Sequence, residues 1–471
     1  MKVIDHIYIN GGFVKPHGKD VFDLINPGTN ALIGQVVLGD ETDTQLAIAS
    51  AKAAFEQFSQ TSVAERMDYL QRLYDAVTER MDDLVAATVE EYGAPQQRAL
   101  ASNQLAANSF LHYKKVLADF EFVRRAGEST VLMMPLGVVG IITPWNANAS
   151  YICNKLATAI AAGCTAVIKP SEMSALQTQI VAECLHEAGL PAGVFNIVNG
   201  LGEVVGAELT RHPDIAKISF TGSTNVGKMI ARGAVDTMKR VTLELGGKSA
   251  NIILEDANFD KAISLAVAAC FMNNGQACIA GSRLLVPEHR LEEAKALLKT
   301  AVAAVKVGDP LEEDTAIGPL VSKKQYDRVQ SYIRLGITEG AELLAGGEGH
   351  PAGLEAGNFV KPTVFAGVTR DMRIAKEEIF GPVLSLMTYK NVAEAIDIAN
   401  DTVYGLQAYV SGEDMSRVNE VAAKLVAGRV LINCLQHDPM APFGGFKQSG
   451  IGREYGAYGL EEYVEPKTII L

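Results

Sequence analysis

Two short clusters in the chain carry the residue types that covalent catalysis requires. The segment ELGGK at 244–248 closes an apolar, strand-like run, and NGQAC at 274–278 places a thiol among small residues after a helix-like run. A cysteine is strongly nucleophilic near neutral pH, and a nearby carboxylate can serve as a base. We therefore interpret Cys278 as a nucleophile and Glu244 as a base, and expect Gly275 and Ala277 to leave room beside the sulfur. The alternative is a buried cysteine that packs as a small hydrophobic residue.

Length and composition indicate a globular protein. The chain has 471 residues, of which 48% are hydrophobic and 21% charged, which is enough for about three domains with substantial cores. No apolar stretch reaches the ~18 residues that a bilayer crossing needs, and the N-terminal segment lacks the apolar core of a signal peptide. The six cysteines form no CxxC pair, and no histidine stands at ligand spacing. We expect a soluble, cytoplasmic protein with reduced cysteines and no metal site.

The charge of the chain limits its partners. The formal net charge is −13, and no basic run interrupts the acidic balance. Such a surface repels phosphate backbones and anionic headgroups. We therefore expect neither a nucleic acid nor a membrane as partner, but a small molecule.

The order of apolar and polar runs predicts an α/β fold. After a polar opening, residues 42–91 show the period of packed helices. From residue 136, short β-branched runs alternate with helical segments, which is typical of a parallel sheet covered by helices. A second alternation starts near residue 251, so we expect two parallel-sheet domains with a ligand cleft between them. The expected strands are 138–143, 165–169, 194–198, 217–220, 241–243, 252–254 and 283–286, and the expected helices of the second domain are 259–273 and 291–307.

Two turns could bind the phosphates of a dinucleotide. The loop 200–206 follows an expected strand and is similar to a Rossmann glycine pattern with one extra residue, but Glu203 would place a negative charge beside the phosphates. Glycines in such a turn can equally have a steric purpose. The segment 220–227 is a better candidate, because a strand ends there in small hydroxyl residues and Ser223 would lie at a helix N-terminus.

A third segment, 168–172, could bind a ribose. Lys169 can reach a ribose hydroxyl or a phosphate, whereas Glu172 would accept two ribose hydroxyls and repel a 2′-phosphate. The pair therefore favours NAD over NADP. The alternative is a solvated ion pair on the surface.

Seven motifs stand in the same order as in a known family, and the similarity runs over nearly the whole chain. On these motifs the sequence resembles the aldehyde dehydrogenase superfamily. The motifs are PWN at 144–146, KPSE at 169–172, FTGS at 220–223, ELGGK at 244–248, GQAC at 275–278, EEIFGP at 377–382 and PFGG at 442–445.

The resemblance implies a covalent mechanism of aldehyde oxidation. Cys278 would attack the aldehyde to give a thiohemiacetal, which would pass hydride to NAD and become a thioester that water hydrolyses. Asn146, in isolation only a turn residue, would form the oxyanion hole with the backbone N–H of Cys278, where charge develops in both addition steps. Glu244 would be the general base for the water and for the thiol. Lys155 and Glu454, which in isolation could be surface groups, match a charged pair that the family uses as a proton relay.

The resemblance also implies a cofactor, NAD with NADP possible, and an extended site for it. Charged residues would hold the adenosine ribose, a glycine–serine turn the pyrophosphate, and a second glutamate with apolar neighbours the nicotinamide end. The expected cofactor-binding residues are Trp145, Lys169, Ser171, Glu172, Gly202, Gly222, Ser223, Leu245, Glu378 and Phe380.

The family's architecture implies a division of the chain. A cofactor domain would comprise residues 1–116 and 136–247, a catalytic domain residues 248–447, and a small β-extension residues 117–135 and 463–471. The apolar C-terminal segment could add a strand to a neighbouring subunit. We therefore expect a homodimer or a homotetramer.

Several positions depart from the family pattern around the expected pocket. Ala147 stands where a bulky aromatic residue is frequent, and Tyr151 and Asn154 follow it closely, so we expect a wider and more polar pocket. His437 lies in a loop of the expected substrate funnel, where it could hydrogen-bond a polar tail or be simply solvated. Cys164 replaces the asparagine of many relatives and indicates only a change in packing.

The sequence leaves the aldehyde open. Aliphatic, aromatic and semialdehyde substrates all remain, but we find no arginine or serine pair for a remote carboxylate in the expected pocket segments, which favours uncharged aldehydes. Acyl transfer to coenzyme A is an alternative, although such relatives usually lack the general-base glutamate that is present here at 244. Two alternatives belong to other functional classes: a non-catalytic role, and a thiol esterase that uses no nucleotide. Loss of Cys278 or of the Lys169 and Glu172 pair would have indicated one of them.

Overall fold

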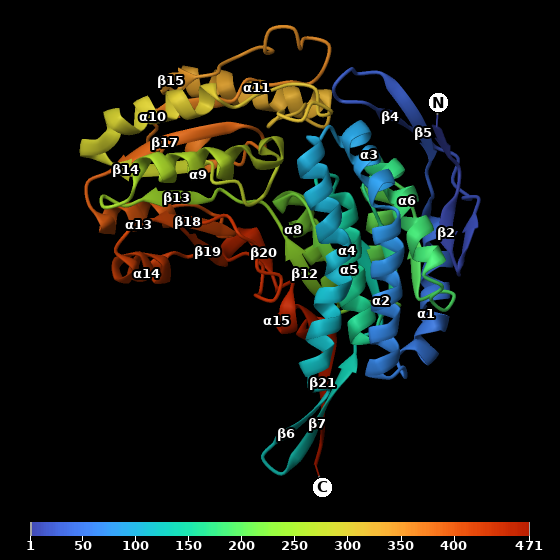
Figure 1. Cartoon of the computed structure of the whole chain (residues 1–471). Helices are drawn as coiled ribbons and strands as arrows, with labels where there is room; N and C mark the ends of the chain where they lie inside the picture. Colours follow the sequence, from blue (N-terminus) through green and yellow to red (C-terminus); the bar gives the residue numbers. More distant parts are fainter. Residues whose placement is uncertain (1, 471) are drawn as a thin grey trace.

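The computed structural model describes residues 2–470 and contains two large sheets and a projecting arm (Figure 1). The first sheet has the strands β2 (Ile7–Ile9), β3 (Gly12–Val14), β8 (Val138–Ile142), β9 (Thr165–Lys169), β10 (Phe195–Ile197), β11 (Ile215–Thr221), β12 (Arg240–Glu244) and β20 (Gly450–Ile451). Their order in space is β20-β12-β11-β8-β9-β10-β2-β3. The five strands from β12 to β10 run parallel, as the alternating sequence pattern predicted.

The second sheet is also mostly parallel. It contains β13 (Ala250–Ile253), β14 (Arg283–Pro287), β15 (Glu342–Ala345), β16 (Thr363–Ala366), β17 (Val383–Tyr389), β18 (Gln407–Ser411) and β19 (Arg429–Ile432). The order is β15-β16-β17-β14-β13-β18-β19, and β15 is its antiparallel edge. The predicted α/β fold with two parallel sheets is therefore confirmed.

Helices cover both faces of the first sheet, and its central strands are fully buried for that reason. Val139 and Ile141 of β8 pack in one core with the helices at 63–79, 96–119 and 148–162, whereas Val138 and Ile142 pack on the opposite face with those at 41–58 and 224–235. The helices are α1 (Glu41–Phe58), α2 (Val63–Glu79), α3 (Met81–Tyr92), α4 (Gln96–Asp119), α5 (Asn148–Ala162), α6 (Ala175–Glu187), α7 (Ala207–Arg211), α8 (Thr224–Val235), α9 (Phe259–Phe271), α10 (Leu291–Ala303), α11 (Lys323–Thr338), α12 (Arg373–Lys376), α13 (Val392–Asn400), α14 (Met415–Lys424) and α15 (Gly456–Glu461). None of the described helices is long and apolar enough to cross a membrane.

The register of the first sheet gathers the sequence motifs at one edge. Ile142 pairs with Lys169 and with Phe220, and Thr221 pairs with Glu244. The carboxyl ends of β8, β9, β11 and β12 therefore lie side by side. In parallel sheets this edge is where ligands bind.

The polar opening of the chain contains strands that the sequence analysis did not predict. Besides β2 and β3, a separate sheet is formed by β1 (Lys2–Ile4), β4 (Val21–Ile25) and β5 (Leu32–Val37). These strands are short and mix polar with apolar residues, so no hydrophobic period reveals them.

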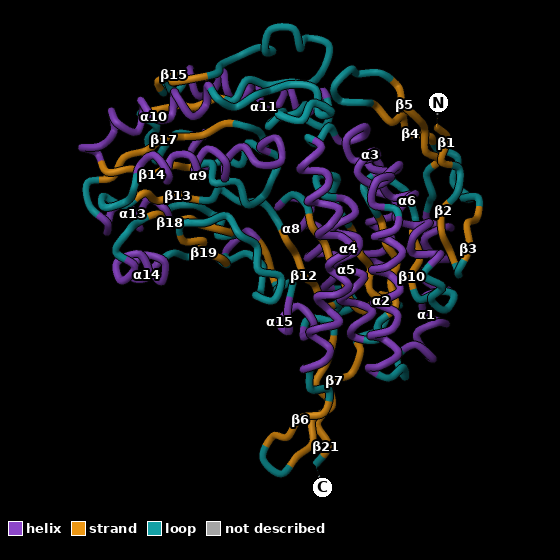
Figure 2. Tube along the Cα trace, viewed as in Figure 1, coloured by secondary structure: helices purple, strands orange, loops and turns teal. Residues whose placement is uncertain are grey.

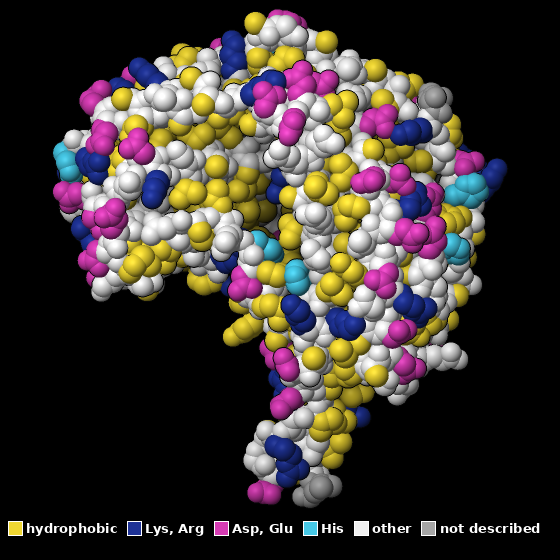
Figure 3. Space-filling view, in the orientation of Figure 1, with side chains coloured by type: hydrophobic (Ala, Val, Ile, Leu, Met, Phe, Trp, Pro, Cys, Tyr) yellow, Lys and Arg dark blue, Asp and Glu magenta, His cyan; other side chains and the backbone are white. Residues whose placement is uncertain are grey.

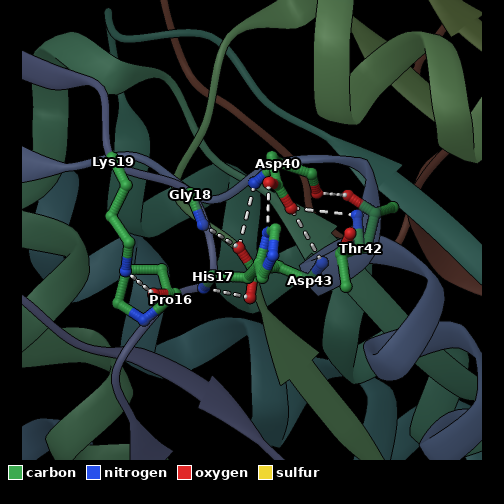
Figure 4. Close-up of polar contacts among 8 residues, drawn as sticks. Pro16, His17, Gly18, Lys19, Asp40, Thr42 and Asp43 are labelled. Carbon is green, nitrogen blue, oxygen red and sulfur yellow. Dashed lines mark hydrogen bonds and ion pairs between the residues drawn. The ribbon is translucent and has the colours of Figure 1, made fainter.

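The N-terminus of α1 ties this segment to the first sheet (Figure 4). The buried carboxylate of Asp43 accepts hydrogen bonds from the backbone N–H groups of His17 (2.8 Å) and Gly18 (3.1 Å), while Asp40 caps the helix. The N–H of the preceding Gly39 donates to the carbonyl of Asn199 (2.7 Å). The capped helix thereby supports the loop that follows β10.

An antiparallel arm projects from the body of the molecule and carries the C-terminus (Figures 1 and 2). It consists of β6 (Val123–Ala126), β7 (Ser129–Pro135) and β21 (Val464–Ile469), in the order β21-β7-β6. Residues 117–119 of the expected extension belong instead to the end of α4. Met1 and Leu471, the ends of the expected domains, lie outside the described residues.

Candidate active site

Two cavities meet at Cys278. The first, of about 470 Å³, follows the carboxyl edge of the first sheet, and the second, of about 200 Å³, lies between that edge and β18 and β19. The space-filling view shows the molecule hollowed between its two lobes, with hydrophobic side chains on the walls (Figure 3). The residues that line both cavities are Asn146, Tyr151, Thr221 and Cys278. A group attached to the sulfur can therefore be reached from two sides.

A strained loop after α9 presents the thiol. Asn273 and Asn274 have φ angles of 54° and 59°, a conformation that asparagine tolerates better than most residues. The side-chain amide of Asn274 donates to the carbonyls of Gly93 and Pro319 (both 3.1 Å) and accepts from the N–H of Gly318 (2.8 Å). These contacts with distant segments hold the loop in place.

Gly275 has a different role from the predicted one. It lines neither cavity, and a Cβ atom there would lie 2.3 Å from the carbonyl carbon of Gly381 and from the nitrogen of Pro382. The missing side chain therefore makes room for a neighbouring backbone and not for a ligand. Ala277 does line the smaller cavity, as expected for a small residue beside the sulfur.

A substitution tests this contact. We expect Gly275→Ala to lower the free energy of unfolding by about 2–4 kcal/mol, because the backbone has φ +71° and the added methyl group overlaps the Gly381 carbonyl. Gly353→Ala is the matched control, with φ +80° and no atom within 4 Å, and should cost only about 1 kcal/mol. Urea unfolding of both variants measures the difference. Equal losses would contradict the proposed steric role.

Glu244 reaches the same place from the end of β12. It is 2% exposed and lines the smaller cavity with Cys278. The strand comes close to the nucleophile because Gly247 has no side chain, since a Cβ atom there would lie 2.3 Å from the carbonyl oxygen of Cys278. The second glycine of the ELGGK motif, Gly247, thus allows Glu244 and Cys278 to approach one another.

Burial makes both groups less acidic than usual. The pKa of Glu244 is raised well above its ordinary value by burial and by the negative charge of Glu454, and neither of its carboxylate oxygens has a hydrogen-bond partner among residues 2–470. Burial, with the charges of Glu378 and Glu244, raises the pKa of Cys278 to about 12. A carboxylate without partners and with a raised pKa is suited to accept a proton from water.

Asn146 and the backbone of Cys278 supply donors beside the sulfur. The side-chain nitrogen of Asn146 donates one hydrogen bond to the carbonyl of Gln276 (2.9 Å), which leaves its second N–H. The backbone N–H of Cys278 has no hydrogen-bond partner within the described part of the chain. The phenol of Tyr151 is buried next to Asn146 and the thiol. The N–H groups of Asn146 and Cys278 beside the sulfur suit an oxyanion hole.

Lys155 and Glu454 lie 299 residues apart in sequence and form a buried ion pair. Lys155 also donates to the hydroxyl of Ser219 (3.1 Å), and Asn154 donates to the second oxygen of Glu454 (3.5 Å). Both charges act on the buried Glu244, and neither residue is a surface group.

The larger cavity has the chemistry that a dinucleotide requires. Ser223 caps α8, whose N-terminus opens into the cavity, and the buried hydroxyl of Thr221 has no partner in the described structure. Glu378 is held by the N–H of Gly247 (3.0 Å). Helix N-terminal N–H groups suit a pyrophosphate, and a buried carboxylate suits ribose hydroxyls.

Aromatic and apolar side chains complete this cavity. Trp145 packs edge-on against Phe380, with ring centroids 5.6 Å apart, and Leu245 lies beside them. The expected residues Trp145, Gly222, Ser223, Leu245, Glu378 and Phe380 thus share one cavity, so the residues present fit NAD.

The expected adenosine contacts lie apart from the cavity lining. Lys169 and Glu172 form an ion pair (3.0 Å) at the end of β9, and Ser171 caps the turn that follows. Gly202 begins the turn after β10. In the same loop a Cβ atom at Gly200 would lie 2.3 Å from the side chain of Val205, which supports a steric reason for that glycine.

The structure also reveals site residues that the sequence analysis missed. The smaller cavity is lined by Arg98 and Arg429, so the prediction that its walls lack an arginine was wrong. His437 lines it as well and contacts Arg429, so it is not simply solvated. Cys164 is buried in the core, where it donates to the carbonyl of Tyr463 (3.4 Å), consistent with a packing role. No local sequence pattern indicates a functional role for Arg429, because its neighbours are those of an ordinary β-strand.

Comparison with known proteins agrees with this geometry. Residues 13–469 match the model of the aldehyde dehydrogenase family. The chain is 45% identical to 3-succinoylsemialdehyde-pyridine dehydrogenase from a Pseudomonas species, over 100% of this chain and 99% of the relative.

Solved structures are also similar to this chain in sequence and in fold. A mutant of aldehyde dehydrogenase C from Pseudomonas syringae, in complex with NAD+ and octanal, superimposes with a TM-score of 0.97 at 45% identity, covering 99% of this chain and 96% of the other. The NAD+ complex of an aldehyde dehydrogenase from Bacillus cereus gives a TM-score of 0.95 at 40% identity, with 99% and 96% coverage. The chain therefore belongs to the aldehyde dehydrogenase family.

Proposed function

We propose that the protein oxidises an aldehyde to a carboxylic acid with NAD+ as the hydride acceptor, through a thioester on Cys278 that water hydrolyses. One aldehyde, one NAD+ and one water give one carboxylic acid, one NADH and one proton. The observation that carries this proposal is the position of Cys278 at the junction of two cavities, with the unpartnered carboxylate of Glu244 in one of them.

Each of the site residues has a separate role in this proposed reaction. The thiol of Cys278 loses its proton to solvent and adds to the carbonyl carbon, and the developing oxyanion accepts hydrogen bonds from Asn146 and from the Cys278 N–H. After hydride loss, Glu244 takes a proton from water, which attacks the thioester. Glu454 and Lys155, whose buried charges act on Glu244, then pass that proton away from the site. The departing sulfur takes up a proton, which restores the thiol.

NAD is the proposed cofactor in preference to NADP. Glu172, paired with Lys169 at the edge of the sheet, would accept ribose hydroxyls and repel a 2′-phosphate. The related structures from Pseudomonas syringae and Bacillus cereus contain NAD+.

The relatives also bear on the size of the substrate. They include a dehydrogenase named for 3-succinoylsemialdehyde-pyridine and one crystallised with octanal, so we propose an aldehyde with a chain of several carbons.

We further propose a homodimer or homotetramer that assembles through the arm, because β21 and β6 leave unpaired strand edges there. We also propose a division of the chain into 1–116 with 136–247, 248–447, and 117–135 with 463–471. The two large sheets and the arm support it, although residues 117–119 end α4 and β20 joins the first sheet. A cytoplasmic location is supported by six cysteines that are all unpaired. Sedimentation of the purified chain tests the assembly.

The experiment that tests the function combines binding with turnover. Trp145 is the only tryptophan of the chain and lines the larger cavity, so NAD+ should quench its fluorescence. Absorbance at 340 nm with a panel of aldehydes should then show NADH formation, weaker with NADP+. Quenching without turnover on every aldehyde would contradict the proposed oxidation, and added coenzyme A that is consumed during turnover would favour acyl transfer.

The pH dependence of the rate follows from the raised pKa values. The reaction needs Cys278 and Glu244 in their unprotonated forms, and burial raises the pKa of both. We expect kcat/KM to increase as the pH rises through neutrality and to be still increasing at about pH 9. Initial rates in overlapping buffers measure the profile, and circular dichroism at each pH controls for unfolding. A rate that falls between neutral pH and about pH 9 while the fold persists would be inconsistent with these assignments.

A further inference from the structure

The smaller cavity contains a partly buried arginine that the proposed mechanism does not use. Arg429 is the first residue of β19, and its side chain lines the cavity together with Cys278. Its positive charge acts on the thiol and is among the influences that lower the pKa of Cys278. An aldehyde bound at the sulfur would therefore share this cavity with the guanidinium.

Every direct partner of this guanidinium is neutral. Its Nε and one terminal nitrogen donate to the side-chain oxygen of Gln407 (3.1 and 2.6 Å), and the other terminal nitrogen donates to Nδ1 of His437 (2.7 Å). Its plane lies over the ring of Phe443, 4.9 Å from the centroid. No carboxylate within residues 2–470 forms an ion pair with Arg429. Three of its five N–H groups are used, which leaves two for a ligand.

His437 is an uncharged partner and not a second cation. Burial and the charge of Arg429 lower its pKa to about 4, and Nδ1 accepts a hydrogen bond because arginine can only donate. The proton of the neutral ring is therefore on Nε2, which is a further donor. The ring also packs edge-on against Tyr455, with centroids 4.9 Å apart, which fixes its orientation.

The other charges around the cavity do not neutralise Arg429. Glu454 is engaged with Lys155, and the pKa of Glu244 is raised so that its carboxyl group holds its proton more readily. Asp438 is exposed to solvent, and its charge acts on Arg429 without an ion pair among residues 2–470. Arg98 lines the same cavity and adds a second cation, whose Nε donates to the side-chain oxygen of Asn273 (3.5 Å). A partly buried cation without an acid is costly, and an anionic ligand removes this cost.

Beside polar side chains such as Ser102 and Tyr409, this cavity has apolar walls. Leu105, Met272, Ile279, Leu431 and Leu435 line them, and such walls suit a methylene chain. One cavity therefore contains fixed donors, a nucleophile and apolar walls, which suits a linear molecule with an anion at one end and an aldehyde at the other.

We propose that the substrate is an aldehyde with a carboxylate at its far end and that Arg429, assisted by His437, binds this carboxylate. The product is then a dicarboxylate. This inference rests on the proposed aldehyde oxidation and names its substrate class. It replaces the expectation of an uncharged aldehyde that the sequence alone favoured.

The test compares molecules of equal chain length. The probes are 6-oxohexanoate, its methyl ester and hexanal, which differ only at the end remote from the aldehyde. In the unmodified enzyme kcat/KM should be at least about tenfold higher for 6-oxohexanoate than for either neutral probe. In Arg429→Gln this ratio should fall by about 10–100-fold, mainly through KM, because the lost contact is made before and during the reaction alike.

Two further variants separate recognition from structure. Arg429→Lys retains the charge and should recover part of the ratio, which a purely structural role would not predict. Arg334→Gln, which removes an exposed arginine paired with Glu348, should leave the ratio unchanged.

The outcomes distinguish this inference from the proposed function. If the enzyme oxidises none of the three probes or any other aldehyde, the proposed function fails. If it oxidises hexanal or the ester at least as well as 6-oxohexanoate, or if Arg429→Gln lowers all three rates equally, the function stands and the carboxylate assignment is overturned.

Discussion

Replacing Cys278 with alanine should abolish aldehyde oxidation, with kcat/KM falling by about 10⁵-fold or more, because no other group can form the covalent intermediate. Asn146, Glu244 and the cavities would remain in place. Nothing else near the junction can substitute, since the other cysteine with partial exposure, Cys434, lines neither cavity. NADH formation at 340 nm over long incubation measures the residual rate.

The control for this variant is another cysteine. Cys434→Ala removes a similarly exposed thiol that lines neither cavity, and it should retain activity within about threefold because a half-buried change that removes no lining group has a small effect. NAD+ should still quench the fluorescence of Trp145 in Cys278→Ala, which would show that binding survives while the chemistry is lost. Turnover retained in Cys278→Ala would remove this residue from the mechanism.

Replacing Glu244 with glutamine should slow steady-state turnover by about 10²–10⁴-fold, because an amide cannot accept the proton of the attacking water. The substitution is nearly isosteric at a site that is 2% exposed, so we expect the cavity to keep its shape. The thioester should accumulate, since hydrolysis is the step that needs the base. Rapid mixing should therefore show a burst of about one NADH per subunit, followed by a slow phase.

The burst also shows which step the carboxylate serves. A full burst at the normal rate would assign Glu244 to the water alone, whereas a slowed burst would assign it to activation of the thiol as well. Glu255→Gln, a change at an exposed glutamate, is the control and should leave both phases unchanged. A steady-state rate in Glu244→Gln equal to that of the unmodified enzyme would exclude Glu244 as the base.

The local sequence pattern was sufficient to predict much of the fold. The expected strands 165–169 and 283–286 correspond to β9 (Thr165–Lys169) and β14 (Arg283–Pro287), because β-branched runs between helical segments have a clear period. The strands before residue 40 were missed because they are short and half polar. Their stability comes from pairing with distant strands, which no local window contains.

For the candidate site, too, local sequence patterns predicted one part and missed another. The types and spacing of Glu244 and Cys278 were visible in the sequence, and the resemblance supplied candidate roles for Asn146, Lys155 and Glu454. The motifs around these residues are short and local, so the sequence by itself determined the family and was enough to propose the reacting groups.

Only the tertiary structure decided which groups surround the reaction. It paired Lys155 with Glu454 across 299 residues, placed Gly275 against the backbone of Gly381, and brought Arg429 into the cavity. These contacts depend on the order of strands in two sheets and on the packing between them, and burial by that packing also raises the pKa values. Side chains from distant segments meet only after the chain has folded, so their neighbours cannot be read from spacing along it.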